Sequence, residues 1–416
     1  MKKTVDLYPM DNSGIIHLAA MRKNYTNSFR ITITLKEKVC KEKLQGALNY
    51  ITPRFPIIIA GIHKGFFQYK IKPVEELLEV HSECVCLAPM GEEKIRNCAF
   101  RVLYKRNQII GEFFHSLTDG YGGLIVMNTL VAEYLRRQYS VSIAESEMIA
   151  DACKCVPEEE LMDDYFTYAG KRAATPKHAN VYQLSGFKPY NYSVLTTTKT
   201  YTTDEILGAA HRYGVSATTF LTAVMVASIM EIQQENLESH SLGKPVQVMV
   251  PVNLRKLFPS RTLHNFSLFA LCGVEPQEKD LSFDELINKI GCQLLSQNSK
   301  EHMSAALAIN TKAASFLLYR GIPLTLKCAL LRLTHQLYGE NNSCISLSNL
   351  GGISLPDNMS EYVTDISLAL TPRMKSSYNC GVASINGKMS ITFSRLYLKP
   401  QLENIFFHRL EQVITI

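Results

Sequence analysis

A short segment around residue 115 constrains the fold of this chain more than any other. Residues 109–114 form an apolar run that predicts a buried strand, and the run stops at His115. A polar loop then leads through Asp119 and Gly120 to residues 124–135, whose apolar side chains recur at helical spacing. The sequence therefore places a histidine between the end of a strand and the start of a helix. A side chain in that position is held by a rigid element and faces a cavity.

His115 is the candidate catalytic residue of this segment. A neutral imidazole accepts the proton of a hydroxyl near neutral pH, so we expect His115 to act as a general base. The alternative is a histidine that only ends a strand. Asp119 has two compatible predicted roles, pairing with a cation and capping the following helix. Gly120 either lets the backbone approach a ligand closely or serves as an ordinary turn residue.

Two later segments carry polar residues at the ends of predicted strands. Residues 246–252 predict a buried strand, and Arg255 follows it. Arg255 is either the partner of a carboxylate across a cleft or part of a solvated basic loop. Residues 344–348 predict another strand, which runs into an Asn-Leu-Gly-Gly turn. The polar side chains expected to line a cavity are Ser116, Asn253, Ser348 and Asn349.

The composition excludes several classes of protein. The chain has 416 residues and a net charge of +6, with scattered basic residues that do not favour nucleic-acid binding. Its 11 cysteines show no zinc spacing, so we expect reduced thiols and no metal site. The longest apolar stretch, residues 217–230, is too short to span a bilayer, so we expect no integral membrane segment and a cytoplasmic protein. A nucleophile elbow, a phosphate-binding loop and a dinucleotide fingerprint are all missing, which disfavours the corresponding enzymes.

The order of predicted elements indicates an α+β protein of two lobes. The first lobe is expected over residues 1–175, a bridge over 176–192 and the second lobe over 193–416. Two sheets with flanking helices form a cleft at their junction, which is the usual place for a ligand. Within this layout residues 1–29 are polar and mixed in composition, whereas residues 313–338 predict helix.

Two hairpins are also predicted. Residues 105–107 separate two strands, so His115 lies at the end of the returning strand of the first hairpin. Asn386 and Gly387 separate two further strands, and this dipeptide is typical of a type I′ turn.

Three motifs resemble those of the chloramphenicol acetyltransferase-like superfamily, which includes the condensation domains of peptide synthetases. They are His115-Ser-Leu-Thr-Asp119-Gly120, Pro251-Val-Asn-Leu-Arg255 and Ser348-Asn-Leu-Gly351. Their order and spacing are most similar to the branch of alcohol acetyltransferases and polyketide-associated acyltransferases. Condensation domains carry a second histidine where this chain has Phe114. The plant branch ends in a motif with tryptophan, which this chain lacks entirely.

The resemblance implies both a fold and a reaction. It implies two chloramphenicol acetyltransferase-like lobes, each a mixed sheet with flanking helices, arranged as a V with the active site in a tunnel between them. Acyl-CoA enters as co-substrate and a small hydroxylated alcohol acceptor receives the acyl group, with His115 as general base, no acyl-enzyme and no bound cofactor. Asp119 is implied to pair with Arg255 as a structural ion pair, and Gly120 to lie near the oxyanion.

Two alternatives stay open at this point. The acyl group is carried either by coenzyme A or by the phosphopantetheine arm of an acyl carrier protein, as in a condensation enzyme. A non-catalytic binding protein on the same fold is the second alternative. The intact set of His115, Asp119, Gly120 and Arg255 argues against it.

Overall fold

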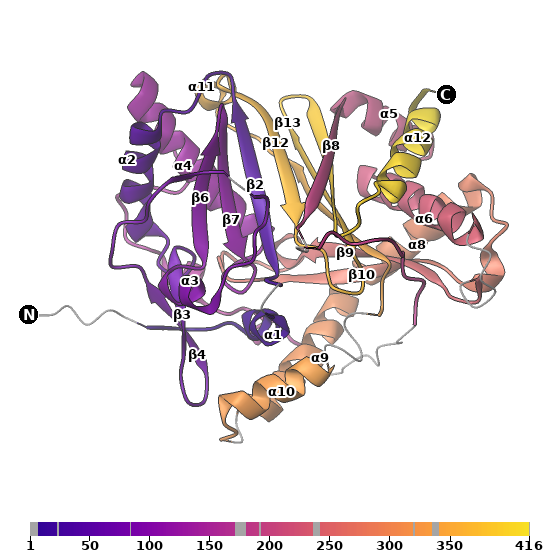
Figure 1. Cartoon of the computed structure of the whole chain (residues 1–416), viewed down its shortest axis with the longest axis horizontal. Coiled ribbons are helices and arrows are strands. Elements are labelled where there is room, and N and C mark those ends of the chain that lie inside the picture. Colours follow the sequence, from indigo (N-terminus) through magenta and orange to yellow (C-terminus); the bar gives the residue numbers. More distant parts are fainter. Residues whose placement is uncertain are drawn as a thin grey trace, which may run out of the picture.

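Two large sheets lie next to each other, and most of the helices flank them on the outer sides (Figure 1). The chain is an α+β protein of two lobes, each a mixed sheet with helices, as predicted. The computed structural model describes residues 7–22, 25–83, 85–170, 180–190, 193–235, 242–318, 321–334 and 341–415.

The first sheet has five strands in the order β12–β2–β7–β6–β5. Its strands are β2 (Ser28–Leu35), β5 (His81–Ser82), β6 (Phe100–Lys105), β7 (Gln108–Phe114) and β12 (Val363–Leu370). Strands β6 and β7 form the predicted hairpin, in which Arg106 has a φ of 52°. The helices of this lobe that lie on the sheet are α2 (Lys41–Ile51) and α4 (Gly120–Tyr139).

Strand β7 is held firmly because almost all of its side chains are buried. Its central Glu112 is fully buried and pairs with Arg30 of β2 and Arg101 of β6. These three residues are register partners across the sheet. Because a buried carboxylate is tolerated only when it is paired, the two guanidinium groups fix β7 in register. The end of β7, where His115 follows, is fixed with it.

The second sheet has six strands in the order β10–β9–β11–β13–β14–β8. They are β8 (Leu195–Thr202), β9 (Val246–Asn253), β10 (Ser267–Val274), β11 (Ile345–Gly352), β13 (Tyr378–Ile385) and β14 (Lys388–Arg395). Asn386 and Gly387 have φ of 50° and 73°, which confirms the type I′ hairpin between β13 and β14. Described helices that belong to this lobe include α5 (Thr203–Arg212), α6 (Ala217–Glu235), α8 (Phe283–Gln297) and α12 (Gln401–Thr415).

Strand β12 joins the two sheets. It lies within residues 193–416, the range predicted for the second lobe, but it pairs antiparallel with β2 of the first sheet. Next to it, a Cβ atom on Gly381 of β13 would meet the carbonyl oxygen of Leu368 at 2.1 Å, so glycine permits the close approach of the two strands. The lobe ranges stay a prediction, and the first sheet is completed by a strand from the second half of the chain.

Most of the remaining elements lie around the base of the first lobe in Figure 1 or between the lobes, whereas helix α11 (Asp357–Ser360) lies near the top of the first lobe. A small sheet contains β1 (Tyr8–Pro9), β3 (Ala60–Lys64) and β4 (Tyr69–Pro73). The remaining helices are α1 (Asn12–Ala20), α3 (Glu92–Asn97), α9 (Lys300–Leu318), α10 (Leu324–Thr334) and α11 (Asp357–Ser360).

One segment was not assigned from the sequence, and one sequence prediction is wrong. Residues 1–29, polar and mixed in composition, contain β1, α1 and the first residues of β2, with Asp11 capping α1. Residues 313–338 were expected to be helical throughout, but α9 and α10 are separate helices. Gly321 between them has a φ of 60°, and Pro323 precedes α10, so the helical hydrogen-bond pattern is broken there. Residues 319–320 and 335–338 of that prediction lie outside the described residues.

No described helix on its own has the length and apolar character needed to cross a bilayer. Helices α5 and α6 meet these criteria only as a pair, which is bent by 81°. Every cysteine in the described part of the chain is a free thiol. Within those same ranges, no group of three His, Cys, Asp or Glu side chains is placed to hold a metal ion. The cytoplasmic location stays a prediction.

Candidate active site

His115 directly follows β7, and its ring is packed by residues of two other elements. Its backbone N–H donates to the carbonyl of Asn27 at 2.9 Å, which continues the pairing of β2 with β7. The half-buried imidazole stacks on His17 of α1 with ring centroids 4.6 Å apart, and it meets Phe29 edge to face. The two rings restrict the rotation of the imidazole, so its orientation is set before a ligand binds.

A side chain from the second half of the chain determines which nitrogen of the His115 ring carries the proton. Nδ1 of His115 lies 2.9 Å from Oδ1 of Asn265, and the amide nitrogen of Asn265 donates to Oδ2 of Asp11 at 3.1 Å. Because a carboxylate only accepts hydrogen bonds, the amide nitrogen faces Asp11 and the amide oxygen faces His115. Nδ1 therefore carries the proton. Nε2 makes no hydrogen bond to a described residue, so its lone pair is available.

The Asp11 carboxylate connects helix α1 to this arrangement. Oδ1 accepts the backbone N–H of Gly14 as the cap of α1. Oδ2 accepts the backbone N–H and the side-chain amide N–H of Asn265. Nδ1 of His264 lies 3.3 Å from the same oxygen without forming a hydrogen bond. Asp11 is almost fully buried. Asp11 was not predicted as a site residue from the sequence, although an aspartate before an apolar helix is a recognisable capping signal.

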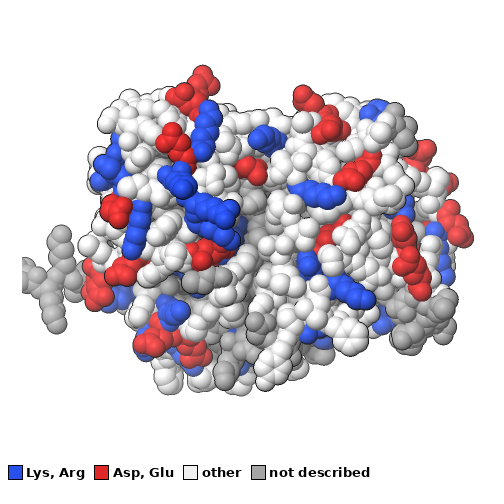
Figure 2. Space-filling model, turned by 45° about the horizontal axis from the view of Figure 1, so that its top comes forward, with Lys and Arg blue, Asp and Glu red and all other residues white. Residues whose placement is uncertain are grey.

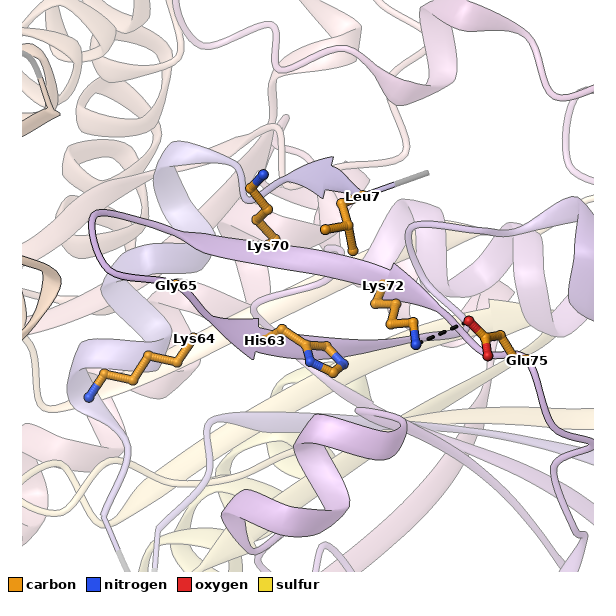
Figure 3. Close-up of a pocket in the computed structure, with 7 residues that line it drawn as sticks. All are labelled: Leu7, His63, Lys64, Gly65, Lys70, Lys72 and Glu75. Carbon is orange, nitrogen blue, oxygen red and sulfur yellow. Dashed lines mark ion pairs between the residues drawn. The ribbon is translucent and has the colours of Figure 1, made fainter. Parts of the chain in front are cut away.

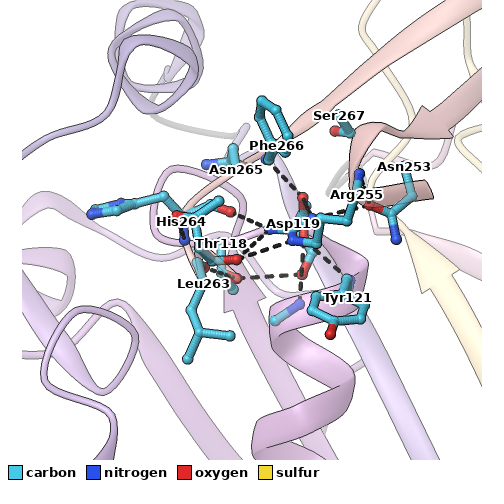
Figure 4. A network of polar contacts seen from close by, with 12 residues as sticks. Thr118, Asp119, Tyr121, Asn253, Arg255, Leu263, His264, Asn265, Phe266 and Ser267 are labelled. Atoms are coloured by element: carbon cyan, nitrogen blue, oxygen red, sulfur yellow. Dashed lines mark hydrogen bonds and ion pairs between the residues drawn. The ribbon is translucent and has the colours of Figure 1, made fainter. Parts of the chain in front are cut away.

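Asp119 caps α4 and also pairs with Arg255, so both of its predicted interactions are present (Figure 4). Oδ1 accepts the backbone N–H groups of Tyr121 and Gly122, each at 3.2 Å. Oδ2 accepts Nη1 of Arg255 at 2.7 Å and the backbone N–H of Phe266 at 2.8 Å. Burial opposes ionisation of Asp119, but Arg255 and these N–H groups outweigh it, and its pKa is lowered from the ordinary value.

The side chain of Arg255 is buried and does not belong to a solvated basic loop. Its side chain is 5% exposed and donates to the carbonyls of Thr262 at 2.8 Å and His264 at 2.7 Å. Since its ion-pair partner also binds Phe266, the Asp119–Arg255 pair holds the chain on both sides of Asn265 (Figure 4). The described structure contains no hydrogen bond between Asp119 and His115. The ion pair therefore acts on the imidazole indirectly, because it holds Asn265 in place.

Gly120 begins α4 and faces the second lobe. A Cβ atom on Gly120 would lie 2.7 Å from Cδ2 of Leu350, which belongs to an irregular part of β11. The Asp119 side chain occupies the next two N–H groups of the helix, whereas the N–H of Gly120 makes no hydrogen bond to a described residue. A backbone donor at the positive end of a 20-residue helix suits a negative charge.

The four residues predicted to line a cavity differ in environment. Ser116 is fully buried, and its hydroxyl has no hydrogen-bond partner in the described structure. Asn253 accepts from the backbone N–H and from Nη1 of Arg255, at 3.1 and 3.2 Å. The side-chain oxygen of Asn253 therefore holds the turn that carries Arg255.

The other two predicted lining residues lie on β11. Ser348 is half-buried and pairs in register with Gly381 of β13. Asn349 donates to Oγ1 of Thr218 at 3.1 Å and accepts the backbone N–H of Gly351 at 2.8 Å. Asn349 thus fixes the turn beside Leu350, and a lining role for Ser116 and Ser348 stays a prediction.

The surface around the lobes is of mixed charge. On the face shown in Figure 2, Lys and Arg gather over the first lobe close to the line where the lobes meet, with Asp and Glu among them. A separate open pocket of about 460 Å³ lies beside the β3–β4 hairpin, and none of its lining residues belongs to the network around His115.

No protein-family model and no curated protein matches the sequence. Solved structures do match over almost the whole chain. TRI101 from F. graminearum, complexed with coenzyme A and T-2 mycotoxin, has a TM-score of 0.64 and 10% identity, covering 96% of each chain. TRI3 trichothecene 15-O-acetyltransferase from Fusarium sporotrichioides has a TM-score of 0.61 and 11% identity, covering 98% of this chain and 94% of that one.

A third match comes from a peptide synthetase. The epimerization domain from the third module of tyrocidine synthetase B has a TM-score of 0.60 and 10% identity, covering 99% of this chain and 97% of that one. At sequence identities this low, the matches show only that these proteins share a fold with this chain. This chain therefore has the two-lobed chloramphenicol acetyltransferase-like fold, which acetyltransferases share with domains of peptide synthetases.

Proposed function

We propose that this protein transfers an acyl group from a thioester, acyl-CoA, to the hydroxyl of a small acceptor. The observation that carries the proposal is the state of the His115 ring, in which Asn265 holds Nδ1 and Nε2 is left for a substrate. The comparisons support the choice of reaction class, because TRI101 was solved with coenzyme A and TRI3 is an O-acetyltransferase of the same fold.

In the proposed reaction, Nε2 of His115 removes the proton of the acceptor hydroxyl as its oxygen attacks the thioester carbonyl. The N–H of Gly120 and the positive end of α4 stabilise the tetrahedral oxyanion. When the intermediate collapses, the C–S bond breaks and the proton on Nε2 passes to the leaving thiolate. The Nδ1 proton stays on the ring throughout, and Asn265 stabilises the transient imidazolium. No acyl-enzyme forms.

Thiol release provides a test that does not require the acceptor to be known. The wild type and His115→Ala are incubated with acyl-CoA of several chain lengths, with and without simple alcohols. Removal of the general base is expected to slow release about 10²–10⁴-fold. His211→Ala, an exposed histidine of α5, is the matched control and should react like the wild type. Wild-type rates in His115→Ala would refute the assignment.

The likeness to a peptide-synthetase domain favours a second candidate donor, an acyl group on the phosphopantetheine arm of a carrier protein. Acyl-CoA and acyl-carrier protein are compared at equal concentration. A strong preference for the carrier would replace coenzyme A as donor and leave the role of His115 unchanged. Binding of both donors without His115-dependent turnover would identify a non-catalytic protein.

A further inference from the structure

Helix α10 presents apolar side chains on two of its faces. One face is buried against the β3–β4 hairpin and contains Leu324 and Cys328. The other face points to solvent, and its residues are spaced four and three apart, which places them on one side of the helix. They are Leu326, Leu330 and Leu333, which are 53, 41 and 54% exposed. A surface helix packs with one apolar stripe, so the second stripe is not explained by folding.

Two phenylalanines at the tip of the hairpin extend this apolar surface. Phe66 and Phe67 are 72 and 50% exposed, and their rings pack edge to face with centroids 4.7 Å apart. The backbone N–H of Leu324 donates to the carbonyl of Phe66, and Nζ of Lys327 donates to the carbonyl of Phe67, each at 2.9 Å. The hairpin tip and α10 therefore form one unit at the base of the molecule in Figure 1. We call it the α10–hairpin surface, formed by Phe66, Phe67, Leu326, Leu330 and Leu333.

The charges of these two segments are all positive. Residues 60–73 and 321–334 contain no Asp or Glu, and their cations are Lys64, Lys70, Lys72, Lys327 and Arg332. Lys72 pairs with Glu75 at 3.0 Å, whereas Lys64 and Lys70 make no ion pair with a described residue. Both of these lysines line the open pocket beside the hairpin (Figure 3). Two lysines that have no ion pair within the described part of the chain therefore flank the exposed apolar side chains.

Exposed leucine and phenylalanine side chains next to lysines fit one kind of surface particularly well. At a lipid bilayer the apolar side chains enter the interface, and the lysines meet anionic headgroups. A second copy of this chain would bring the same cations together at a symmetric contact, which disfavours self-association. We propose that the α10–hairpin surface docks this protein on an anionic lipid bilayer without spanning it. The proposal concerns binding and does not depend on the proposed reaction.

The docking surface is connected to the candidate active site. Nε of Arg332 in α10 donates to the carbonyl of Ala19 in α1 at 2.7 Å. Helix α1 also carries His17, whose ring stacks on His115. An acceptor or donor drawn from a bilayer would therefore meet the protein on the side of α1.

Vesicle sedimentation tests the proposal on the full chain. The vesicles contain phosphatidylcholine alone, or phosphatidylcholine mixed with anionic phosphatidylglycerol. We expect binding to the mixed vesicles that weakens as salt is raised, and much weaker binding to phosphatidylcholine alone. Leu326→Gln combined with Leu333→Gln should weaken binding on the order of tenfold or more. Lys64→Gln combined with Lys70→Gln should weaken it about 30-fold on the mixed vesicles.

The matched control is Leu295→Gln on α8, since Leu295 is 78% exposed and lies outside the α10–hairpin surface. It should bind like the wild type. The substituted side chains are exposed, except that of Lys70, which is half-buried, so each variant should unfold close to the wild-type temperature, which thermal unfolding checks. Absence of binding to the mixed vesicles, or equal binding by the wild type and both double variants, would overturn the proposal.

A fluorescent probe gives an independent reading, because the chain contains no tryptophan. Leu330→Trp should show a blue shift of its emission when anionic vesicles are added, whereas Leu295→Trp should show none. Sedimentation equilibrium without lipid tests whether a second copy of this chain binds the α10–hairpin surface instead. A dimer that Leu326→Gln with Leu333→Gln dissociates would identify an interface between two copies and would also overturn the proposal.

Discussion

Asn265 Oδ1 lies 2.9 Å from Nδ1 of His115, although 150 residues separate them in the sequence. Asn265 in turn donates to Asp11, which is 254 residues away. Three distant segments thus meet at the imidazole. The carboxylate fixes the amide, and the amide fixes which ring nitrogen carries the proton. A general base at Nε2 requires that arrangement.

Replacement of Asn265 by alanine should lower kcat on the order of ten- to a thousandfold, because the ring loses the acceptor that keeps the proton on Nδ1. The KM for the thioester should change little. Thiol-release kinetics measure the rate, and ¹⁵N chemical shifts of the imidazole report which nitrogen is protonated. Asn404→Ala, at an exposed position of α12, is the control. Unchanged kcat and unchanged ring shifts in Asn265→Ala would exclude this positioning role.

Asp11→Asn should separate the effect of Asp11 on catalysis from its effect on stability. Asparagine caps a helix about as well as aspartate, so the unfolding temperature should stay near that of the wild type. An amide can donate as well as accept, so Asn265 is no longer held in one orientation and kcat should fall, by less than in Asn265→Ala. Asp11→Ala should lose the cap as well, at a cost of about 1 kcal/mol. Equal kcat in Asp11→Asn and the wild type would contradict the proposed orientation of Asn265.

Asp119→Asn should lower the free energy of unfolding by about 3–5 kcal/mol, because the substitution leaves buried Arg255 without its counter-charge. The folded-state pKa of Asp119 lies below the ordinary value of 3.8. Its contribution to stability is therefore fully present above that value and is lost as the pH falls through the folded-state pKa. Urea unfolding at a series of pH values measures this. The free energies of unfolding of the wild type and Asp119→Asn should become equal in acid.

Asp280→Asn is the control for this comparison, since Asp280 is exposed and should change stability by less than about 0.5 kcal/mol. A gap between the wild type and Asp119→Asn that stays constant down to strongly acidic pH would contradict the linkage argument.

Gly120→Ala should reduce activity more than stability. The added methyl group would lie 2.7 Å from Cδ2 of Leu350, the end of a side chain that can move, so the protein should still fold. The methyl group also lies beside the N–H proposed to bind the oxyanion, and loss of such a donor costs on the order of 10²-fold in kcat. Steady-state kinetics and thermal unfolding measure the two effects.

Gly208→Ala provides the glycine control, because a Cβ atom at Gly208 of α5 meets nothing within 4 Å. The double variant Gly120→Ala with Leu350→Ala removes the steric contact and keeps the methyl group. Full recovery of kcat in the double variant would show that Gly120 is needed for packing and not for the oxyanion.

The sequence alone determined the features that depend on neighbouring residues. The apolar run of β7 predicts a strand, and the glycines and helical spacing after His115 predict the start of α4. Asn386 and Gly387 predict their hairpin because few dipeptides adopt positive φ at both positions. Residues 313–338 show the limit of this reasoning, since apolar helical spacing alone did not reveal the interruption at Gly321 and Pro323.

Only the tertiary structure decided which distant segments meet. Nothing local marks β12 as a partner of β2, because an alternating strand pairs equally well with many edges. Likewise, Asn265 and Asp11 are ordinary polar residues in the sequence, and no periodic pattern connects them to His115. Their roles arise because packing of the two lobes buries them together, and buried polar groups must then satisfy one another. The sequence therefore identifies the histidine, whereas the fold determines its protonated nitrogen.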